Sequence, residues 1–277
     1  MSAQAPGLTV VCIGDCGVDR YVDVDLDRAG GITLNFAVTA TACFSPTDEV
    51  IVLTALGADA EADVVLDAME RCGLERHVAR LAGRTPVQYL ERQPTGERRF
   101  LRYDEGVLAH YRPGPVELQL MARADLLVTN VYRQVHAFFE AVMAAPVSGL
   151  RFVDFLDLGD WDDGPRFVAG YLDRFDIGQF GLQPDDEPTI GRLESLARDH
   201  GKLFIVTLGA HGSLALGCGE RIRCAAEPVR SVVDTTGAGD AFAAGFLGCY
   251  CRTRDVARSL RAGSRRAASV IQQLGAF

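Results

Sequence analysis

Short apolar runs alternate with longer segments of helical spacing along most of the chain. Runs of apolar and β-branched residues without polar alternation are typical of strands that are covered on both faces. Such runs predict buried strands at 8–14, 50–55, 125–129, 151–155, 179–182 and 203–207, and short final strands at 222–225 and 230–233. Helical spacing predicts helices at 34–43, 60–72, 238–250 and 256–272. This order predicts an α/β fold with a doubly wound, mostly parallel sheet.

Two segments break the alternation because they have strand-like periodicity with no helix between. Residues 18–27 alternate and predict one edge strand, and 86–103 forms two alternating runs around Pro94-Thr95-Gly96, which indicates a β-hairpin. We expect these insertions, near 18–33 and 85–106, to form a small β-sheet lid on a single domain that spans 1–277.

Composition and charge argue against several classes of protein. The chain has 277 residues, 48% of them hydrophobic, and a formal net charge of -9. An acidic chain argues against a nucleic-acid partner or an anionic membrane surface, since both require clustered Lys and Arg. No apolar run reaches the roughly 18–20 residues that span a bilayer, and the first residues lack the features of a secretion signal. The eight cysteines include no C-x-x-C pair, so we expect free thiols and a cytoplasmic protein.

The segment Val233–Phe246, VDTTGAGDAFAAGF, carries the clearest chemistry. The amides of Gly237, Ala238 and Gly239 at a helix start form an anion hole for a phosphoryl group. Asp240 in the first turn is placed to take a proton from a substrate hydroxyl. The alternative is an ordinary glycine-rich turn in which Asp240 only complements the helix dipole.

This segment resembles the C-terminal signature of the pfkB family of carbohydrate kinases, D-T-x-G-A-G-D-x-F. Further segments follow in the order of that family: Gly14-Asp15, Val18-Asp19, Gly30-Gly31 with Asn35, TLGAHGS at 207–213, 262–268 and Gly275-Ala276. The resemblance covers nearly the whole chain. It implies a ribokinase-like fold and an enzyme that uses ATP and Mg²⁺.

The resemblance also implies roles for single residues. Substrate-binding residues are expected at Asp19, Gly30, Gly31, Asn35 and Asp154. Nucleotide-binding residues are expected at Thr207, Gly209, Gly212, Ser264 and Ala268. Glu187 is expected to reach the metal through water. For Asp154 the expectation comes from its position and not from the resemblance, because loops at the carboxyl end of parallel strands line the ligand crevice.

Departures from the family pattern bear on the substrate. Gly17 stands where many members have Asn, Ile32 follows Gly30-Gly31 in place of Lys, and Pro184 replaces the Asn of N-x-x-E. These changes speak against ribose. On the hairpin, Arg98 and Arg102 are expected on one face, either exposed or in contact with substrate or phosphate.

Four short segments resemble the fructoselysine 6-kinase subgroup: YDEGVLAHY, VDFLDLGDWDD, QPDDE and VIQQLGAF. We therefore expect phosphorylation of a terminal hydroxyl on a small sugar or sugar amine, with a fructoselysine-type ketose amine favoured. The alternatives are another sugar or nucleoside kinase of the family and a non-catalytic sugar- or nucleotide-sensing protein on the same fold. The resemblance also allows a homodimer formed through the lid.

Overall fold

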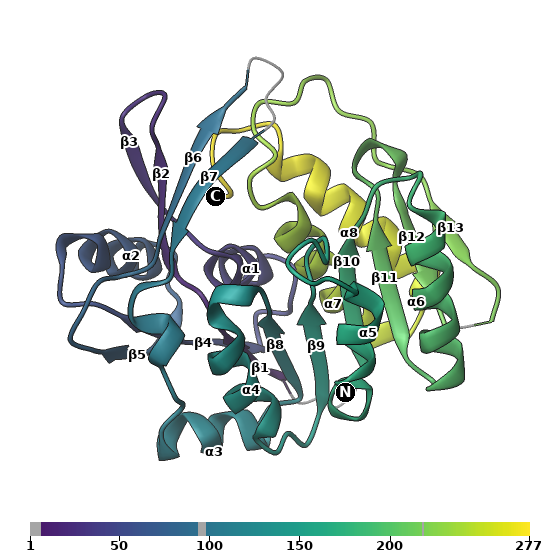
Figure 1. Cartoon of the computed structure of the whole chain (residues 1–277), viewed down its shortest axis with the longest axis horizontal. Coiled ribbons are helices and arrows are strands. Elements are labelled where there is room, and N and C mark those ends of the chain that lie inside the picture. The colour runs from purple at the N-terminus through teal and green to yellow at the C-terminus, as the bar shows by residue number, and fades with distance from the viewer. Residues whose placement is uncertain (1–6, 94–97, 218) are drawn as a thin grey trace, which may run out of the picture.

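The computed structural model describes residues 7–93, 98–217 and 219–277, which form a large and a small β-sheet with eight α-helices (Figure 1). The large sheet has the strand order β13-β12-β11-β10-β9-β8-β1-β4-β5. Its strands are β1 (Thr9–Ile13), β4 (Glu49–Leu56), β5 (Glu75–Arg80), β8 (Leu126–Asn130), β9 (Leu150–Asp154), β10 (Ile177–Gly181), β11 (Leu203–Thr207), β12 (Ser213–Leu216) and β13 (Ile222–Cys224). All neighbours from β5 to β11 are parallel, and only β12 and β13 pair antiparallel.

Helices cover both faces of this sheet, because parallel strands need crossover connections. One face carries α1 (Ile32–Ala40), α2 (Ala60–Arg71), α7 (Ala238–Thr253) and α8 (Val256–Val270). The other carries α3 (Pro115–Arg123), α4 (His136–Ala144), α5 (Gly164–Ala169) and α6 (Glu187–Asp199). In β1, Val10 and Cys12 pack toward the first layer, whereas Val11 and Ile13 pack toward the second. The predicted doubly wound, mostly parallel α/β fold is confirmed.

The small sheet has the order β3-β2-β6-β7 and lies above the carboxyl ends of the parallel strands (Figure 1). Its strands are β2 (Gly17–Tyr21), β3 (Leu26–Gly30), β6 (Val87–Arg92) and β7 (Arg98–Asp104). β2 pairs antiparallel with β3, and β6 with β7, while β2 and β6 are parallel. Both predicted insertions therefore contribute to one sheet. The predicted turn at Pro94-Thr95-Gly96 lies outside the described residues.

Two strand predictions were wrong and two strands were missed. Residues 18–27 are not one edge strand, because the chain turns at 22–25 and returns as β3. The alternation misled because Val22 and Val24 in this turn are exposed although they are apolar. Residues 230–233 are not a strand either. β5 was missed because it is a charged edge strand, and β12 because it is short.

Two further predictions concern cysteines and membranes. The cysteines of the described segments carry free thiols, as predicted: Cys12, Cys16, Cys43, Cys72, Cys224, Cys249 and Cys251. Cys218 lies outside the described residues. Within the described part of the chain, none of the helices has the length and apolarity needed to cross a bilayer.

Candidate active site

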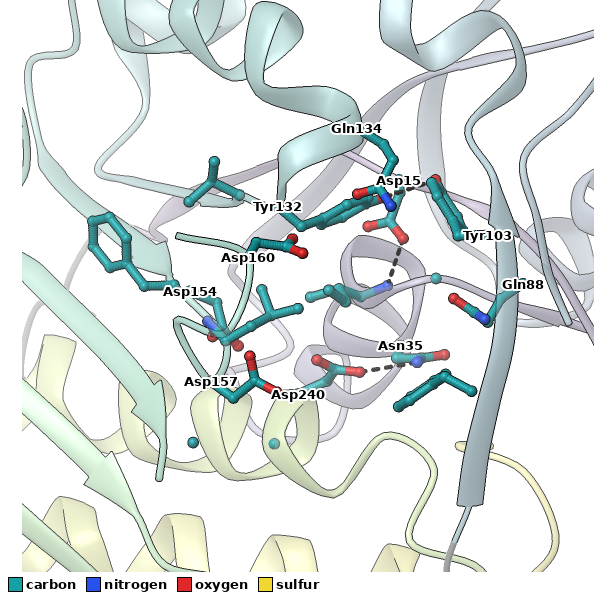
Figure 2. Close-up of a pocket in the computed structure, with 18 of the residues that line it drawn as sticks. Asp15, Asn35, Gln88, Tyr103, Tyr132, Gln134, Asp154, Asp157, Asp160 and Asp240 are labelled. Atoms are coloured by element: carbon teal, nitrogen blue, oxygen red, sulfur yellow. Dashed lines mark hydrogen bonds between the residues drawn. The ribbon is translucent and has the colours of Figure 1, made fainter. Parts of the chain in front are cut away.

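A cavity of about 590 Å³ opens between the small sheet and the carboxyl ends of the parallel strands (Figure 2). Its floor includes residues at or just after the ends of β1, β8, β9, β10 and β11: Asp15, Tyr132, Asp154, Gln179 and Thr207. The sheet order reverses between β1 and β8, because the chain first adds strands on one side of β1 and later on the other. Ligands of open α/β sheets bind at such a switch point, so this cavity is the candidate substrate site.

Asp240 lines the floor of the cavity from the first turn of α7, and the residue is only 8% exposed. Asn35 of α1 donates from Nδ2 to its Oδ2 at 2.9 Å, which fixes the direction of the carboxylate (Figure 2). The first turn of a helix offers N–H groups without intrahelical partners and a positive dipole end. The structure thus puts an acid beside a helix end of the kind that can bind an anion. The anion-binding role of this helix end and the general-base role of Asp240 stay predictions.

The glycine turn before Asp240 requires Gly237. This residue has φ 74°, and a Cβ on it would lie 2.4 Å from the Cβ of Ala276, so a larger residue does not fit. Gly237 and Gly239 line the cavity. Ala238 differs from its neighbours, because its N–H already donates to the Thr235 carbonyl at 3.2 Å. The geometry therefore favours Gly237 and Gly239 over Ala238 as donors to a phosphoryl group.

A buried carboxylate, Asp234, joins this turn to the lid and to the end of the chain. It accepts hydrogen bonds from the Tyr21 hydroxyl at 2.9 Å, from the N–H and hydroxyl of Thr236 at 2.8 and 2.6 Å, and from the Gly275 N–H at 2.9 Å. Burial favours the neutral acid, but the hydrogen bonds outweigh burial and lower the pKa of Asp234. Because Tyr21 belongs to β2, the buried Asp234 carboxylate connects the glycine turn to the lid.

Two more buried carboxyl groups face the cavity (Figure 2). Asp15 accepts from two backbone N–H groups at the start of α1, at 3.3 and 3.5 Å. Asp154 accepts from the Leu156 N–H at 2.9 Å and from Nε2 of Gln179 at 3.0 Å. Burial raises the pKa of both carboxyl groups, that of Asp154 to about 6. At neutral pH Asp154 is therefore chiefly a carboxylate that can accept hydrogen bonds from hydroxyls or pair with an ammonium group.

The loop that follows β9 forms a side wall and brings two further acids to the cavity. Asp157 accepts from the Gly159 N–H at 2.8 Å, and Asp160 accepts from the Arg133 N–H at 2.9 Å. Leu156 and Leu158 in this loop have φ of 56° and 64°. Such left-handed conformations are uncommon for non-glycine residues and often occur at ligand sites.

The lid contributes the consecutive residues Phe100–Tyr103 to the roof of the cavity. Strict alternation would turn only two of them inward, but a register shift after Tyr89 leaves Leu101 without a partner in β6. The Arg102 guanidinium lies 4.1 Å from the centre of the Tyr89 ring. Arg102 thus lines the cavity, whereas the side chain of Arg98 lies outside the described residues.

The predicted substrate residues fall into two groups. Gly31, Asn35 and Asp154 line the cavity, whereas Asp19 and Gly30 are not among the described residues that line it. A Cβ on Gly30 would lie 2.3 Å from Oδ2 of Asp19. Gly30 therefore makes room for the carboxyl group of Asp19. The substrate roles of all five stay predictions.

Of the predicted nucleotide-binding residues, one lines the cavity and four are not among the described residues of its lining. Thr207 lines the cavity at the end of β11. The Ser264 hydroxyl instead ties α8 to the loop at 225–227, accepting from the N–H of Glu227 at 2.8 Å and donating to the carbonyl of Ala225 at 3.3 Å. Four of the predicted residues are not among the described residues of the lining: Gly209, Gly212, Ser264 and Ala268. Their roles stay predictions.

Glu187, predicted to reach a metal through water, begins α6 and forms an ion pair. Both of its carboxylate oxygens lie near Nη1 of Arg221, at 2.9 and 3.3 Å, and Arg221 also contacts Glu194 at 3.0 Å. The described residues contain no group of three or more acidic, His or Cys side chains arranged for a metal. Mg²⁺ commonly takes one or two carboxylates together with substrate phosphates, so its site does not require such a group. The metal role of Glu187 stays a prediction.

The sequence interpretation missed several polar residues of the cavity. Gln179 bonds to Asp154, the Tyr132 hydroxyl donates to the Tyr103 hydroxyl at 2.6 Å, and Gln88 lies on the lid strand β6 (Figure 2). Gln179 had a recognisable signal, since it is the one polar side chain in the strand IGQFG. The tyrosines gave none, because tyrosine in or after a strand is ordinary.

Comparisons with known proteins show which proteins this chain is similar to. Residues 179–277 match the pfkB family carbohydrate kinase profile. Fructoselysine 6-kinase of Escherichia coli (strain K12) is 28% identical over 97% of this chain and 99% of its own length. The 2-dehydro-3-deoxygluconokinase of Dickeya dadantii (strain 3937) is 27% identical over 97% and 96%.

The fold extends the likeness beyond the matched C-terminal segment. The crystal structure of a probable sugar kinase from Rhizobium etli CFN 42 superposes with a TM-score of 0.81 at 20% identity, covering 98% of this chain and 95% of the other. The predicted ribokinase-like fold and the resemblance to pfkB carbohydrate kinases are confirmed. The prediction of a carbohydrate kinase is confirmed with them.

Proposed function

We propose that this pfkB-type sugar kinase transfers a phosphoryl group from ATP to a terminal hydroxyl of a neutral or amine-bearing sugar, with fructoselysine-type ketose amines favoured. One observation carries the proposal. Asp240 lies at the start of α7, beside the glycine turn, and faces a cavity in which the charged side chains of the described lining are carboxylates apart from Arg102. The proposal thus combines a site for phosphoryl transfer with a site for a substrate rich in hydrogen-bond donors.

Asp240 acts in the proposed reaction as the general base. Asn35 holds Oδ2 of its carboxylate at 2.9 Å, so the carboxylate is oriented before the substrate arrives. The substrate hydroxyl gives its proton to Asp240 as its oxygen bonds to the γ-phosphorus of ATP and the bond from that phosphorus to ADP breaks. General-base catalysis of this kind typically raises the rate by roughly 10²–10⁴-fold. The N–H groups of Gly237 and Gly239 hold the developing negative charge.

The glycine turn suits a phosphoryl group because it has no side chain at Gly237 and lies directly before the N-terminus of α7. A Cβ at Gly237 would meet Ala276, and the same turn precedes the first turn of α7. When bound, ATP supplies the transferred group and Mg²⁺ neutralises the charge on its phosphate oxygens. Thr207 lines the cavity beyond this turn and is the proposed boundary with the nucleotide. No step of the mechanism depends on Glu187.

The charge of the cavity supports the proposed substrate class. Five carboxyl groups line it: Asp15, Asp154, Asp157, Asp160 and Asp240. Of the described residues in the lining, Arg102 is the only cationic one, and its guanidinium lies over the ring of Tyr89. Carboxylates bind hydroxyls and ammonium groups and repel anions. A sugar acid or a sugar phosphate should therefore fit this cavity less well than a sugar amine. The name of the Dickeya relative, 2-dehydro-3-deoxygluconokinase, indicates a sugar acid.

The test is a side-by-side measurement of kcat/KM by ADP release on fructoselysine, fructose, ribose, a nucleoside, 2-dehydro-3-deoxygluconate and a sugar phosphate. We expect the highest value for fructoselysine and low values for the two anions. Preference for either anion would overturn the charge argument. Preference for ribose would show that the positions of Gly17 and Ile32 do not decide the substrate.

A further inference from the structure

Gln179 lines the cavity, and no role was predicted for it from the sequence. It lies on β10 in register with Asp154 of β9, so both side chains emerge side by side from neighbouring strands. Gln179 is only 2% exposed and lines the cavity. Its neighbours across the floor are Asp154 on one side and the first turn of α7 on the other.

The hydrogen bonds of Gln179 fix the orientation of its amide. Nε2 lies 3.0 Å from Oδ2 of Asp154 and 3.2 Å from the carbonyl oxygen of Gly239. Both partners are acceptors, so the amide must present its NH₂ group to them. The opposite orientation would set the amide oxygen against two other oxygens. Both hydrogens of the amide are therefore used, and Oε1 is left as an acceptor.

Oε1 of Gln179 is buried without a hydrogen-bond partner among the described residues. Asn35 repeats the pattern, because its Nδ2 donates to Asp240 while its buried Oδ1 has no partner in the described part of the chain. An unsatisfied buried acceptor costs about 1–3 kcal/mol, and native proteins keep few of them. Gln179 and Asn35 both line the cavity, so a ligand with hydroxyl groups that fills it is the candidate partner for these acceptors.

We propose that Gln179 is a specificity-determining residue whose Oε1 accepts a hydrogen bond from a substrate hydroxyl other than the one that is phosphorylated. The same amide, through Nε2, holds Asp154 and the first turn of α7 together. Recognition of that hydroxyl is thus linked to the position of the turn that carries Asp240. The inference rests on the proposed function only in taking a sugar as the ligand.

Removal of the acceptor should abolish the preference for one hydroxyl. A buried polar group built to bind a hydroxyl discriminates strongly against an analogue that lacks it, because the group is then left unpaired. For wild-type protein we expect one deoxy analogue of fructose to bind about 10-fold to 100-fold more weakly than fructose. In Gln179→Met, which keeps the length of the side chain, the same analogue and fructose should bind within about 3-fold of each other.

The experiment measures binding and turnover separately. The single tryptophan, Trp161, lines the cavity and reports binding by its fluorescence. Fructose and analogues that each lack one hydroxyl are titrated into wild type, Gln179→Met and the control Thr129→Val. Thr129 also has a buried hydroxyl without a partner among the described residues, but it is not in the described lining. Thr129→Val should bind the deoxy analogue as weakly, relative to fructose, as wild type does. The ratio of kcat/KM for fructose to that for the analogue should change in the same way as the ratio of affinities.

The outcomes separate this inference from the proposed function. Equal penalties in wild type and Gln179→Met, for every analogue, would overturn the inference and indicate that water satisfies Oε1. If the weaker binding of the deoxy analogue disappears only in Gln179→Met, the result supports the inference. It does so even if no sugar of the panel is phosphorylated, and in that case only the proposed function fails. If Gln179→Met does not fold, Gln179→Glu serves. It retains an acceptor for the hydroxyl but sets a carboxylate against Asp154, so the penalty should persist while kcat falls.

Discussion

The buried carboxyl group of Asp154 makes the stability of the protein depend on pH in a way that one substitution can isolate. Burial, against the opposing hydrogen bonds from Leu156 and Gln179, raises its pKa from 3.8 to about 6. Asp154→Asn keeps the shape of the side chain and removes the titration. The variant also loses one acceptor, because an amide has one oxygen where the carboxylate has two. That loss is independent of pH, so the informative quantity is the change of the stability difference with pH.

The sign follows from the direction of the shift. Since the folded state binds the Asp154 proton more tightly than the unfolded state, folding is favoured at low pH, and this contribution is lost as pH rises from 3.8 through about 6. A shift of about two pKa units corresponds to about 3 kcal/mol at most. Between about pH 4 and about pH 7, the free energy of unfolding of wild type should therefore fall relative to that of Asp154→Asn by up to this amount.

Urea unfolding of both proteins at several pH values across this range measures the difference directly. Other titrating groups contribute to both proteins and largely cancel. Asp162→Asn, the same change at an exposed acid in the same loop region, is the control for the substitution itself. A difference for Asp154→Asn that does not change with pH would refute the reasoning, because it would mean that solvent reaches the carboxylate and burial does not raise its pKa.

Three further changes test Asp240, the glycine turn before it and the contact of Asp234 with the lid. Asp240→Asn keeps the shape but cannot accept the proton, so kcat should fall by roughly 10²–10⁴-fold while the far-UV spectrum is unchanged. Gly237→Ala places a Cβ 2.4 Å from that of Ala276 at φ 74°, and should lower the free energy of urea unfolding by about 1–3 kcal/mol and reduce kcat. Tyr21→Phe removes the hydroxyl that donates to Asp234 at 2.9 Å and should cost about 1–3 kcal/mol in the same assay.

The glycine and tyrosine changes each have a matched control. Gly191→Ala adds a methyl group in α6 where a Cβ meets nothing within 4 Å, so stability should not fall. Tyr250→Phe removes a hydroxyl that makes no hydrogen bond within the described part of the chain. Near-normal turnover by Asp240→Asn would contradict the base assignment, and equal losses for both tyrosines would show that the contact with Asp234 contributes little.

The strand–helix alternation and the glycine–acid motif at 237–240 could be predicted from the sequence because both are local patterns. Apolar runs fix which segments are buried strands, and glycines followed by an acid fix a helix start with Asp240 in its first turn. The lid was also predictable in outline, although the turn at 22–25 and the bulge at Leu101 were not. Both depend on how β2 and β7 pair with their neighbours, which a run of alternating residues does not specify.

Only the tertiary structure decided which polar groups meet in the site. Gln179 reaches Asp154 through strand register and Gly239 across 60 residues of chain, and Tyr21 reaches Asp234 across 213. The environment of a buried group follows from such contacts and not from its residue type. Asp234 and Asp154 are the same amino acid, yet hydrogen bonds lower the pKa of one and burial raises that of the other. The sequence therefore determined the fold and the reaction type, and packing at the strand ends determined the chemistry of the pocket.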